Sequence, residues 1–270
     1  MELNKIYNEN CLDTMARMPN NFVDLTLTSP PYDNLRDYKG YVFPFEYIAK
    51  ELYRVTKEGG VVVWVIGDAT KDGCESLTSF KQSIYFVENC GFKLHDTMIY
   101  EKETLPLSHR RYEQHFEYMF VFVKGKIKTF NGIKEKSIHF GQSKFSAKNS
   151  ASLNEKRSKQ GGKLGKVMTI NEYKLRGNIW EYETGFNGHS KDKIAFKHPA
   201  IFPEQLAVDH IYSWSNENDL VYDCFGGSGT TAKMAHLLKR NWILSEISSE
   251  YCEIAEKRIK PYLNQTSINF

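Results

Sequence analysis

The order of the apolar segments constrains the fold of this chain more than any other feature of its sequence. Short β-branched runs alternate with stretches whose apolar residues have helical spacing. The predicted strands are residues 3–7, 22–28, 61–66, 92–101, 116–123, 219–224 and 242–247. The predicted helices are residues 11–18, 45–55, 76–89, 203–214, 230–238 and 250–262. This alternation predicts an α/β fold with a doubly wound, mostly parallel sheet.

A basic segment interrupts the alternation once. Residues 125–197 contain 16 Lys and Arg against 6 Asp and Glu, so this segment has a charge of about +10. The net charge of the whole chain is +3, so the rest of the chain is acidic overall. We therefore expect three parts: residues 1–124, a basic insert at 125–197, and residues 198–270. The insert is either a solvated surface segment or a surface that contacts a phosphate backbone.

The cysteines and the apolar runs narrow the class of protein. Five cysteines without a C-x-x-C pair predict a reducing, cytoplasmic compartment, with no zinc site and no disulfide framework. The longest apolar run, residues 61–66, is much shorter than a membrane span, and the first residues show no signal peptide. We expect neither a membrane segment nor a bound metal.

The strand at residues 22–28 runs directly into Ser29-Pro30-Pro31-Tyr32. Neither proline can donate a backbone hydrogen bond, and both restrict the chain to extended geometry. The tetrapeptide thus presents a hydroxyl, free carbonyl groups and an aromatic ring at the carboxyl end of a strand, where open α/β sheets bind ligands. Such a set can hold a flat ring that bears an amine. The alternative is a Pro-Pro turn with a packing tyrosine.

A second group of residues has the pattern strand, glycine turn and helix start. The turn brings its backbone close to a ligand, and Glu246 lies at the end of the next predicted strand, where a carboxylate can accept both ribose hydroxyls. The glycines alone do not distinguish a dinucleotide from S-adenosylmethionine. The candidate cofactor-binding residues here are Asp223, Phe225, Gly227, Ser228, Gly229, Thr230 and Glu246.

These motifs resemble those of the DNA methyltransferases that methylate an exocyclic amine. Residues 29–32 match the family's catalytic form (Ser/Asp/Asn)-Pro-Pro-(Tyr/Phe/Trp), and residues 223–231 match its cofactor motif with Cys224 in place of proline. The order of catalytic motif, insert and cofactor motif is similar to the family's β group. Residues 178–181 and 198–206 are also similar to family sequences, although Phe202 stands where lysine is usual. The segment at residues 7–11 resembles the adenine-contacting one, with Asn10 replacing an aspartate, which adds Asn10 and Cys11 to the cofactor candidates.

The resemblance implies a Rossmann-like, seven-stranded-type sheet, S-adenosylmethionine as cofactor and double-stranded DNA as substrate. It implies that residues 125–197 are the target-recognition region and that the target base is flipped out of the duplex. It makes a homodimer and an accompanying restriction endonuclease plausible, in the cytoplasm of a prokaryote or as a phage product. Serine at position 29 favours cytosine N4 as the methylated atom, with adenine N6 as the alternative.

The residues of the tetrapeptide suggest how an amide-like amine is activated. Acceptors for its two N–H bonds favour the pyramidal geometry needed for attack, and Ser29 Oγ and the Pro30 carbonyl are the proposed acceptors. Tyr32 would stack on the flipped base. No cysteine follows a proline at the catalytic position, so we reject methylation of carbon 5.

Four basic residues near the predicted site are further candidates for contacts with DNA phosphates. Arg36 and Lys39 follow the tetrapeptide, and Arg110 and Arg111 lie between two predicted strands. Solvated loops are the alternative in both places. At the level of the whole protein, the alternatives are a DNA-binding module without catalysis, a nicotinamide dehydrogenase on the same kind of sheet, and an enzyme that acts on RNA.

Overall fold

The computed structural model consists of two compact units. Unit 1 comprises Met1–Asn131 and Asn178–Phe270, and unit 2 comprises Gly132–Gly177. The described residues are 1–31, 43–102, 112–145, 167–183, 185, 188–190, 192–198, 201 and 203–263. Within them, no helix is both long and apolar enough to cross a membrane.

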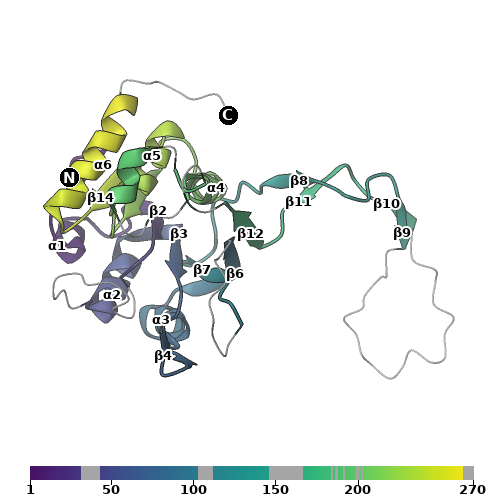
Figure 1. Cartoon of the computed structure of the whole chain (residues 1–270), viewed down its shortest axis with the longest axis horizontal. Coiled ribbons are helices and arrows are strands. Elements are labelled where there is room, and N and C mark those ends of the chain that lie inside the picture. The colour runs from purple at the N-terminus through teal and green to yellow at the C-terminus, as the bar shows by residue number, and fades with distance from the viewer. Residues whose placement is uncertain are drawn as a thin grey trace. The chain divides into compact units, whose positions relative to one another are not determined.

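Unit 1 is built on an eight-stranded sheet with the order β1-β14-β13-β2-β3-β7-β6-β12 (Figure 1). Only β7 runs antiparallel to its neighbours, so the predicted α/β fold with a mostly parallel sheet is confirmed. The strands are β1 (Lys5–Tyr7), β2 (Val23–Thr28), β3 (Thr56–Ile66), β6 (Lys93–Lys102), β7 (Phe116–Val123), β12 (Ile179–Tyr182), β13 (Leu220–Asp223) and β14 (Asn241–Ser245).

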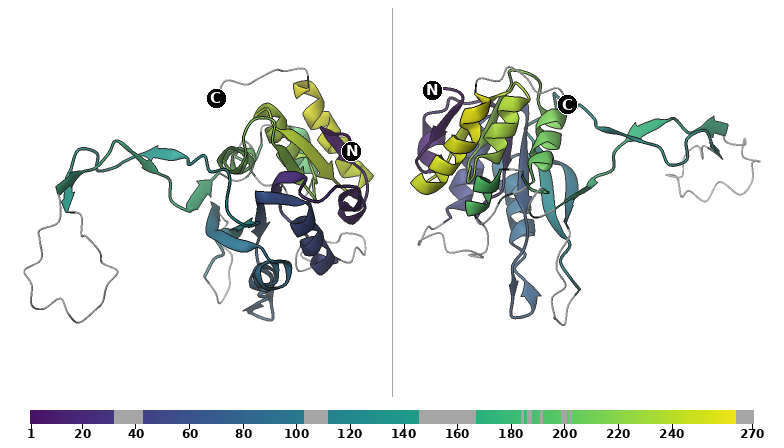
Figure 2. Two further views of the ribbon diagram at one scale, coloured as in Figure 1. Left: turned by 180° about the vertical axis from the view of Figure 1, so that it is seen from behind. Right: turned by 45° about the horizontal axis from the view of Figure 1, so that its top comes forward.

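Helices cover both faces of this sheet (Figures 1 and 2). They are α1 (Cys11–Ala16), α2 (Phe45–Val55), α3 (Thr78–Tyr85) with the π-helical turn η1 (Phe86–Cys90), the 3-10 turn η3 (Lys193–Lys197), α4 (Glu204–Trp214), α5 (Thr230–Leu237), α6 (Ser249–Ile259) and the 3-10 turn η4 (Lys260–Tyr262). On β3, Val62 and Trp64 pack into one apolar cluster with α1, α2 and η1. Val61, Val63 and Val65 alternate with them on the other face and are also buried. Burial on both faces explains why β3 is almost continuously apolar.

Glycines 59 and 60 lie inside β3, which begins directly after α2 at Thr56. The register between β2 and β3 shifts here, as at a β-bulge. Gly59 has a φ of +80°, and a Cβ on Gly60 would lie 2.9 Å from the carbonyl oxygen of Asp24. Glycine is therefore required by the bulge and by the close approach of β2.

Unit 2 begins later and ends earlier than the basic segment at residues 125–197. Trp180 and Tyr182 are buried because β12 pairs with β6 and so extends the sheet of unit 1. Two side chains fix the chain where it leaves and rejoins unit 1. Asn131 Nδ2 donates to the carbonyl oxygens of Tyr212 and Ser215 at 3.0 and 3.1 Å. Asn178 Nδ2 donates to the carbonyl oxygen of Thr97 at 3.1 Å.

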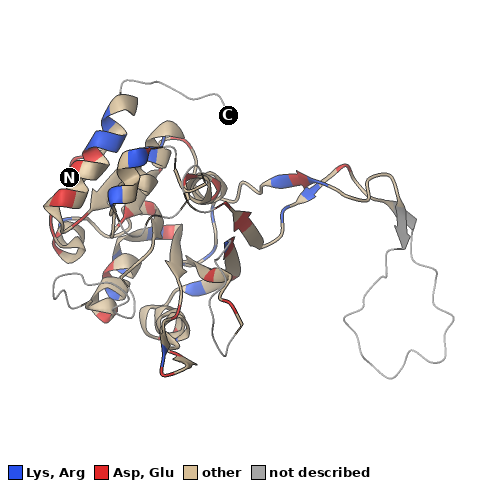
Figure 3. Ribbon diagram, in the orientation of Figure 1, with Lys and Arg blue, Asp and Glu red and all other residues tan. Residues whose placement is uncertain are grey.

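Within unit 2, β8 (Lys134–Lys136) pairs antiparallel with β11 (Tyr173–Leu175), and β9 (Ser143–Phe145) pairs with β10 (Val167–Thr169). Opposed residues share a face of a two-stranded ribbon, so Lys134 and Lys136 lie on one face with Leu175 and Tyr173. All four are exposed. On the other face, Lys174 Nζ forms an ion pair with Glu135 Oε1 at 2.8 Å. Figure 3 shows basic and acidic residues together along β8 and β11.

Candidate active site

Three neighbouring parallel strands bring the predicted motifs to one edge of the sheet. Ser29 follows β2, Asp223 ends β13 and Glu246 follows β14. Because β14, β13 and β2 are consecutive in the sheet and point the same way, their carboxyl ends meet at that edge. Ser29 is half-buried and Pro30 is buried. Tyr32, Arg36, Lys39, Arg110 and Arg111 lie outside the described residues.

The end of β2, directly before the tetrapeptide at residues 29–32, contacts the start of the cofactor motif through two buried side chains. Thr28 Oγ1 donates a hydrogen bond of 2.7 Å to Asp223 Oδ1. The backbone N–H of Phe225 donates to the same oxygen at 3.1 Å. Burial raises the pKa of the Asp223 carboxyl, and these hydrogen bonds oppose the rise by favouring the ionised form. Asp223 therefore joins the end of β2 to the start of the turn after β13.

Residues 225–229, the glycine turn, are held by close packing behind them. A Cβ on Gly226 would lie 2.1 Å from Leu244 Cδ2 on β14, and a Cβ on Gly229 would lie 2.7 Å from Ala255 Cβ on α6. Gly227 and Gly229 have φ values of +47° and +80°, a region that favours glycine. The turn leads into α5, whose first N–H groups have no acceptor within the helix. It is therefore a fixed backbone cradle at a helix start.

The carboxylate of Glu246 is bound by backbone donors. Its Oε2 accepts from the N–H of Gly227 at 2.9 Å, and its Oε1 accepts from the N–H of Ser248 at 2.8 Å. Asn8 Nδ2 holds the Glu246 carbonyl at 2.9 Å. Burial raises the pKa of the Glu246 carboxyl, and the two backbone hydrogen bonds act in the opposite direction. Each carboxylate oxygen retains a lone pair for a ligand hydroxyl.

The Asn10 and Cys11 side chains have structural roles at the start of α1. Asn10 Oδ1 accepts from the N–H of Leu12 at 2.9 Å, which is an N-cap. Cys11 is 4% exposed, and burial raises the pKa of its thiol to about 12. The thiol is therefore neutral at physiological pH and packs as a small apolar group.

The Phe225 ring lies against Phe43 at a centroid distance of 5.6 Å and against Trp64 at 6.3 Å. The ring is half-buried, so it can offer an apolar surface beside the glycine turn. Two other candidates, Ser228 in the turn and Thr230 at the start of α5, are used internally, because the hydroxyls of both accept hydrogen bonds from Arg258 on α6. Thr28 and Arg258 are functional candidates that sequence reasoning missed, whereas Asn8 lies in the segment at residues 7–11 that it had singled out.

The residues present fit an adenosyl cofactor. A Cβ on Gly227 would come within 2.9 Å of His198 Nε2, so the His198 ring packs directly against the turn and glycine is required there. Glu246 supplies a half-buried carboxylate acceptor of the kind that ribose hydroxyls need. Among the described residues, no group of His, Cys, Asp and Glu could hold a metal ion.

The fold and this site define a methyltransferase that acts on an amino group of DNA, with S-adenosylmethionine as methyl donor. A family model for N6 and N4 methyltransferases, described as DNA methylase, matches residues 23–257, and the chain belongs to this family. It is 54% identical over 244 residues to the orphan methyltransferase M.BamHII of Bacillus amyloliquefaciens, covering 89% of this chain and 90% of that protein. It is 26% identical to the type II methyltransferase M.BglII of Bacillus subtilis, covering 94% of this chain and 68% of that protein.

Solved structures share the fold over almost the whole chain. The PvuII DNA methyltransferase, titled cytosine-N4-specific, superposes with a TM-score of 0.70 at 21% identity, covering 98% of this chain and 88% of that chain. The complex of M1.HpyAVI with S-adenosylmethionine superposes with a TM-score of 0.59 at 25% identity, covering 94% and 98%. Because the chain belongs to the DNA methylase family, the alternative of a nicotinamide dehydrogenase is wrong.

The raised pKa of Glu246 leads to a prediction for the pH dependence of cofactor binding. If the ribose hydroxyls donate to the ionised carboxylate of Glu246, affinity should be full above the pKa of this group and fall as the pH drops through it. Because that pKa lies above the ordinary value of 4.5, the fall should begin at a higher pH than for an exposed glutamate. Calorimetric titration of S-adenosylmethionine between about pH 8 and about pH 5 measures this.

Two variants isolate the contribution of Glu246. Glu246→Gln is neutral at every pH, so its affinity should be low and nearly independent of pH over this range. Glu250→Gln removes an exposed carboxylate from the first turn of α6 and should retain the wild-type profile. An unchanged profile in Glu246→Gln would show that another group titrates.

Proposed function

We propose that this enzyme transfers the methyl group to the exocyclic N4 of a cytosine that is flipped out of duplex DNA. The contact between Thr28 and Asp223 carries the proposal, because it joins the strand end that leads into Ser29 to the start of the glycine turn. The choice of cytosine rests on Ser29, since serine at this position favours cytosine N4 in the resemblance described above. Adenine N6 is the second candidate, because the same acceptors suit either amine.

The tetrapeptide would prepare the amine for attack. The lone pair of an exocyclic amine is delocalised into the ring, and two hydrogen-bond acceptors favour the pyramidal form in which the lone pair is available. Ser29 Oγ and the Pro30 carbonyl are the acceptors, and they bind the charge that develops on the nitrogen more tightly than the ground state. Tyr32 would stack on the base and fix its plane.

The cofactor side of the site would provide binding and orientation. Glu246 accepts the ribose hydroxyls, Phe225 contacts the adenosyl group, and the glycine turn lets its backbone approach the ligand. When bound, S-adenosylmethionine supplies a methyl group on a positively charged sulfur. Alignment of amine and methyl group then supplies much of the rate enhancement. As the N–C bond forms, the bond between the methyl carbon and sulfur would break, S-adenosylhomocysteine would leave, and the surplus proton of the nitrogen would pass to water.

Unit 2 would contribute target recognition. Its sequence contains eleven Lys and Arg against three Asp and Glu, which suits a phosphate backbone. Arg36, Lys39, Arg110 and Arg111 are proposed to contact phosphates close to the flipped base. A homodimer and a cognate restriction endonuclease stay predictions from the family resemblance.

The base assignment is tested by mass spectrometry of nucleosides from unmethylated duplex DNA after incubation with the protein and isotope-labelled S-adenosylmethionine. Labelled N4-methylcytosine is the expected product. Labelled N6-methyladenine would keep the mechanism and overturn the choice of base. A parallel reaction with single-stranded RNA of the same sequence should give no labelled nucleoside, and label in RNA alone would contradict the proposed substrate.

A further inference from the structure

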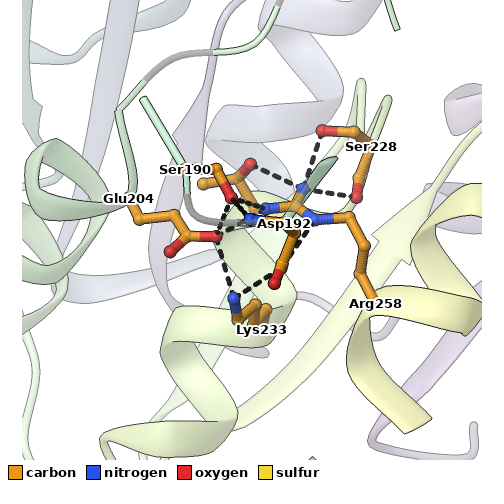
Figure 4. A network of polar contacts seen from close by, with 7 residues as sticks. Ser190, Asp192, Glu204, Ser228, Lys233 and Arg258 are labelled. Atoms are coloured by element: carbon orange, nitrogen blue, oxygen red, sulfur yellow. Dashed lines mark hydrogen bonds and ion pairs between the residues drawn. The ribbon is translucent and has the colours of Figure 1, made fainter. Parts of the chain in front are cut away.

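A cluster of charged side chains lies directly behind the glycine turn. Lys233 of α5 and Arg258 of α6 are 4% and 2% exposed, so both cations are almost completely buried. They face two carboxylates, one from Asp192 before η3 and one from Glu204 at the start of α4 (Figure 4). Two positive and two negative groups balance, which burial of charge requires.

Arg258 divides its hydrogen bonds between the carboxylates and the backbone that leads into α5. Its Nη1 donates to the Ser228 carbonyl oxygen at 2.7 Å, to Ser228 Oγ at 2.8 Å and to Thr230 Oγ1 at 3.0 Å. Its Nη2 donates to Glu204 Oε1 at 2.6 Å, and its Nε donates to Asp192 Oδ2 at 3.3 Å. The guanidinium thus bridges the glycine turn and the two carboxylates.

Lys233 provides an internal comparison. Its Nζ binds the same two carboxylates, at 2.6 Å from Asp192 Oδ2 and 2.9 Å from Glu204 Oε1. Burial alone would raise the pKa of Asp192, but the hydrogen bonds and charges of both cations lower it overall. Both cations therefore neutralise the two carboxylates. The hydrogen bonds from this cluster to Ser228 and Thr230 are donated by Arg258.

We propose that Arg258 is a positioning residue that sets the conformation of the glycine turn for cofactor binding. By holding the carbonyl and hydroxyl of Ser228 and the hydroxyl of Thr230 towards α6, it leaves the opposite side of the turn to the ligand. This inference rests on the proposed role of the turn in binding S-adenosylmethionine. Lysine cannot replace the guanidinium here, because one ammonium lacks the planar fork that spans acceptors on two sides.

The packing of α6 supports this assignment. Ala255 and Arg258 are three residues apart and lie on the same side of the helix. Ala255 closes the space behind Gly229, and Arg258 binds the residues on either side of that glycine. Arg258 also donates to Ser190 Oγ at 3.4 Å, and Ser190 Oγ donates to Glu204 Oε1 at 2.8 Å. The turn is therefore tied to the chain between β12 and α4.

The experiment compares Arg258→Lys with Lys233→Met in the full-length protein. Binding of S-adenosylmethionine and S-adenosylhomocysteine is measured by calorimetry, the melting temperature by circular dichroism, and DNA methylation at saturating cofactor. Both variants should melt at a lower temperature, because each disturbs the buried ion cluster. Arg258→Lys alone should weaken binding of both ligands, by about tenfold. Its kcat at saturating cofactor should remain within about threefold of wild type.

Further variants cover the case in which Arg258→Lys does not fold. Thr230→Val removes one acceptor of Arg258 with little change in shape and should weaken binding in the same direction by a smaller factor. Arg240→Lys alters another buried arginine, which binds the Ser215 carbonyl oxygen at 2.7 Å, and should leave cofactor affinity unchanged.

Two results would overturn the inference. One is wild-type affinity in Arg258→Lys, or in Thr230→Val if the arginine variant is unfolded. The other is an equal loss of affinity in Lys233→Met, which would assign the effect to the ion cluster as a whole. Failure of the wild-type protein to bind either ligand would instead contradict the proposed role of the glycine turn itself.

Discussion

Replacing Ser29 with alanine is expected to lower kcat by about 100-fold to 1,000-fold, the usual effect of removing one group that stabilises charge in a transition state. The Ser29 hydroxyl is proposed to accept a hydrogen bond from the amine and is not among the groups proposed to bind cofactor. The dissociation constant for S-adenosylmethionine should therefore stay within about twofold of wild type. Single-turnover methyl transfer and calorimetric titration separate the two quantities.

Ser29→Asp is the matched variant. It keeps an acceptor at the same position, and aspartate is one of the residues that the family's tetrapeptide form allows there. It should therefore retain more activity than the alanine variant. Wild-type kcat in Ser29→Ala would show that the amine does not depend on this hydroxyl, and an equal loss in both variants would point to distortion of the strand end.

Replacing both Lys134 and Lys136 with alanine is expected to weaken binding to duplex DNA by about 30-fold at about 0.15 M salt, if each lysine contacts one phosphate. Both lysines are exposed on the same face of the β8 and β11 ribbon, beside Tyr173. The slope of log affinity against log salt should become shallower by about 1.8. Fluorescence anisotropy over a series of salt concentrations measures both effects.

Lys174→Ala is the control from the opposite face of the ribbon. Lys174 is also exposed, but Glu135 is paired with it, so the local charge there is already balanced. Lys174→Ala should change the affinity for DNA and the salt slope less than the removal of either Lys134 or Lys136 does. A loss equal to that of Lys134→Ala would indicate a general charge effect of unit 2 instead of one binding face.

The fold of unit 1 was largely predictable because its central strands, β2, β3 and β13, are buried on both faces. Runs such as residues 61–66 are too uniformly β-branched for any other element, and α2 shows helical spacing throughout. β12 was harder to predict, since residues 178–182 follow a long basic segment and their pairing with β6 is a contact distant in sequence. Glycines 59 and 60, a helix-ending signal by themselves, belong to a strand because the β2–β3 bulge requires them.

The meeting of the two motifs could also be predicted, because both follow strands that run parallel. The residues that join the two motifs could not be predicted. In the sequence, Thr28 looks like one more β-branched residue of a buried strand. The hydrogen bond of its hydroxyl to Asp223 becomes visible only in the folded chain. Arg258 is one of two basic residues in the last turn of α6, where a cation is ordinary. Its burial against Ser228 depends on tertiary packing that no local pattern encodes.

The two asparagines of unit 1 that flank unit 2 have a consequence for how such enzymes diversify. Asn131 holds the carboxyl end of α4, and Asn178 holds β6 directly before β12 begins. Both anchors bind backbone carbonyl groups of unit 1 itself, so the chain is held in place on either side of unit 2. If unit 2 recognises the target sequence, as proposed above, we expect it to be exchangeable between related enzymes. Sequence specificity would then change while unit 1 keeps its fold and its chemistry.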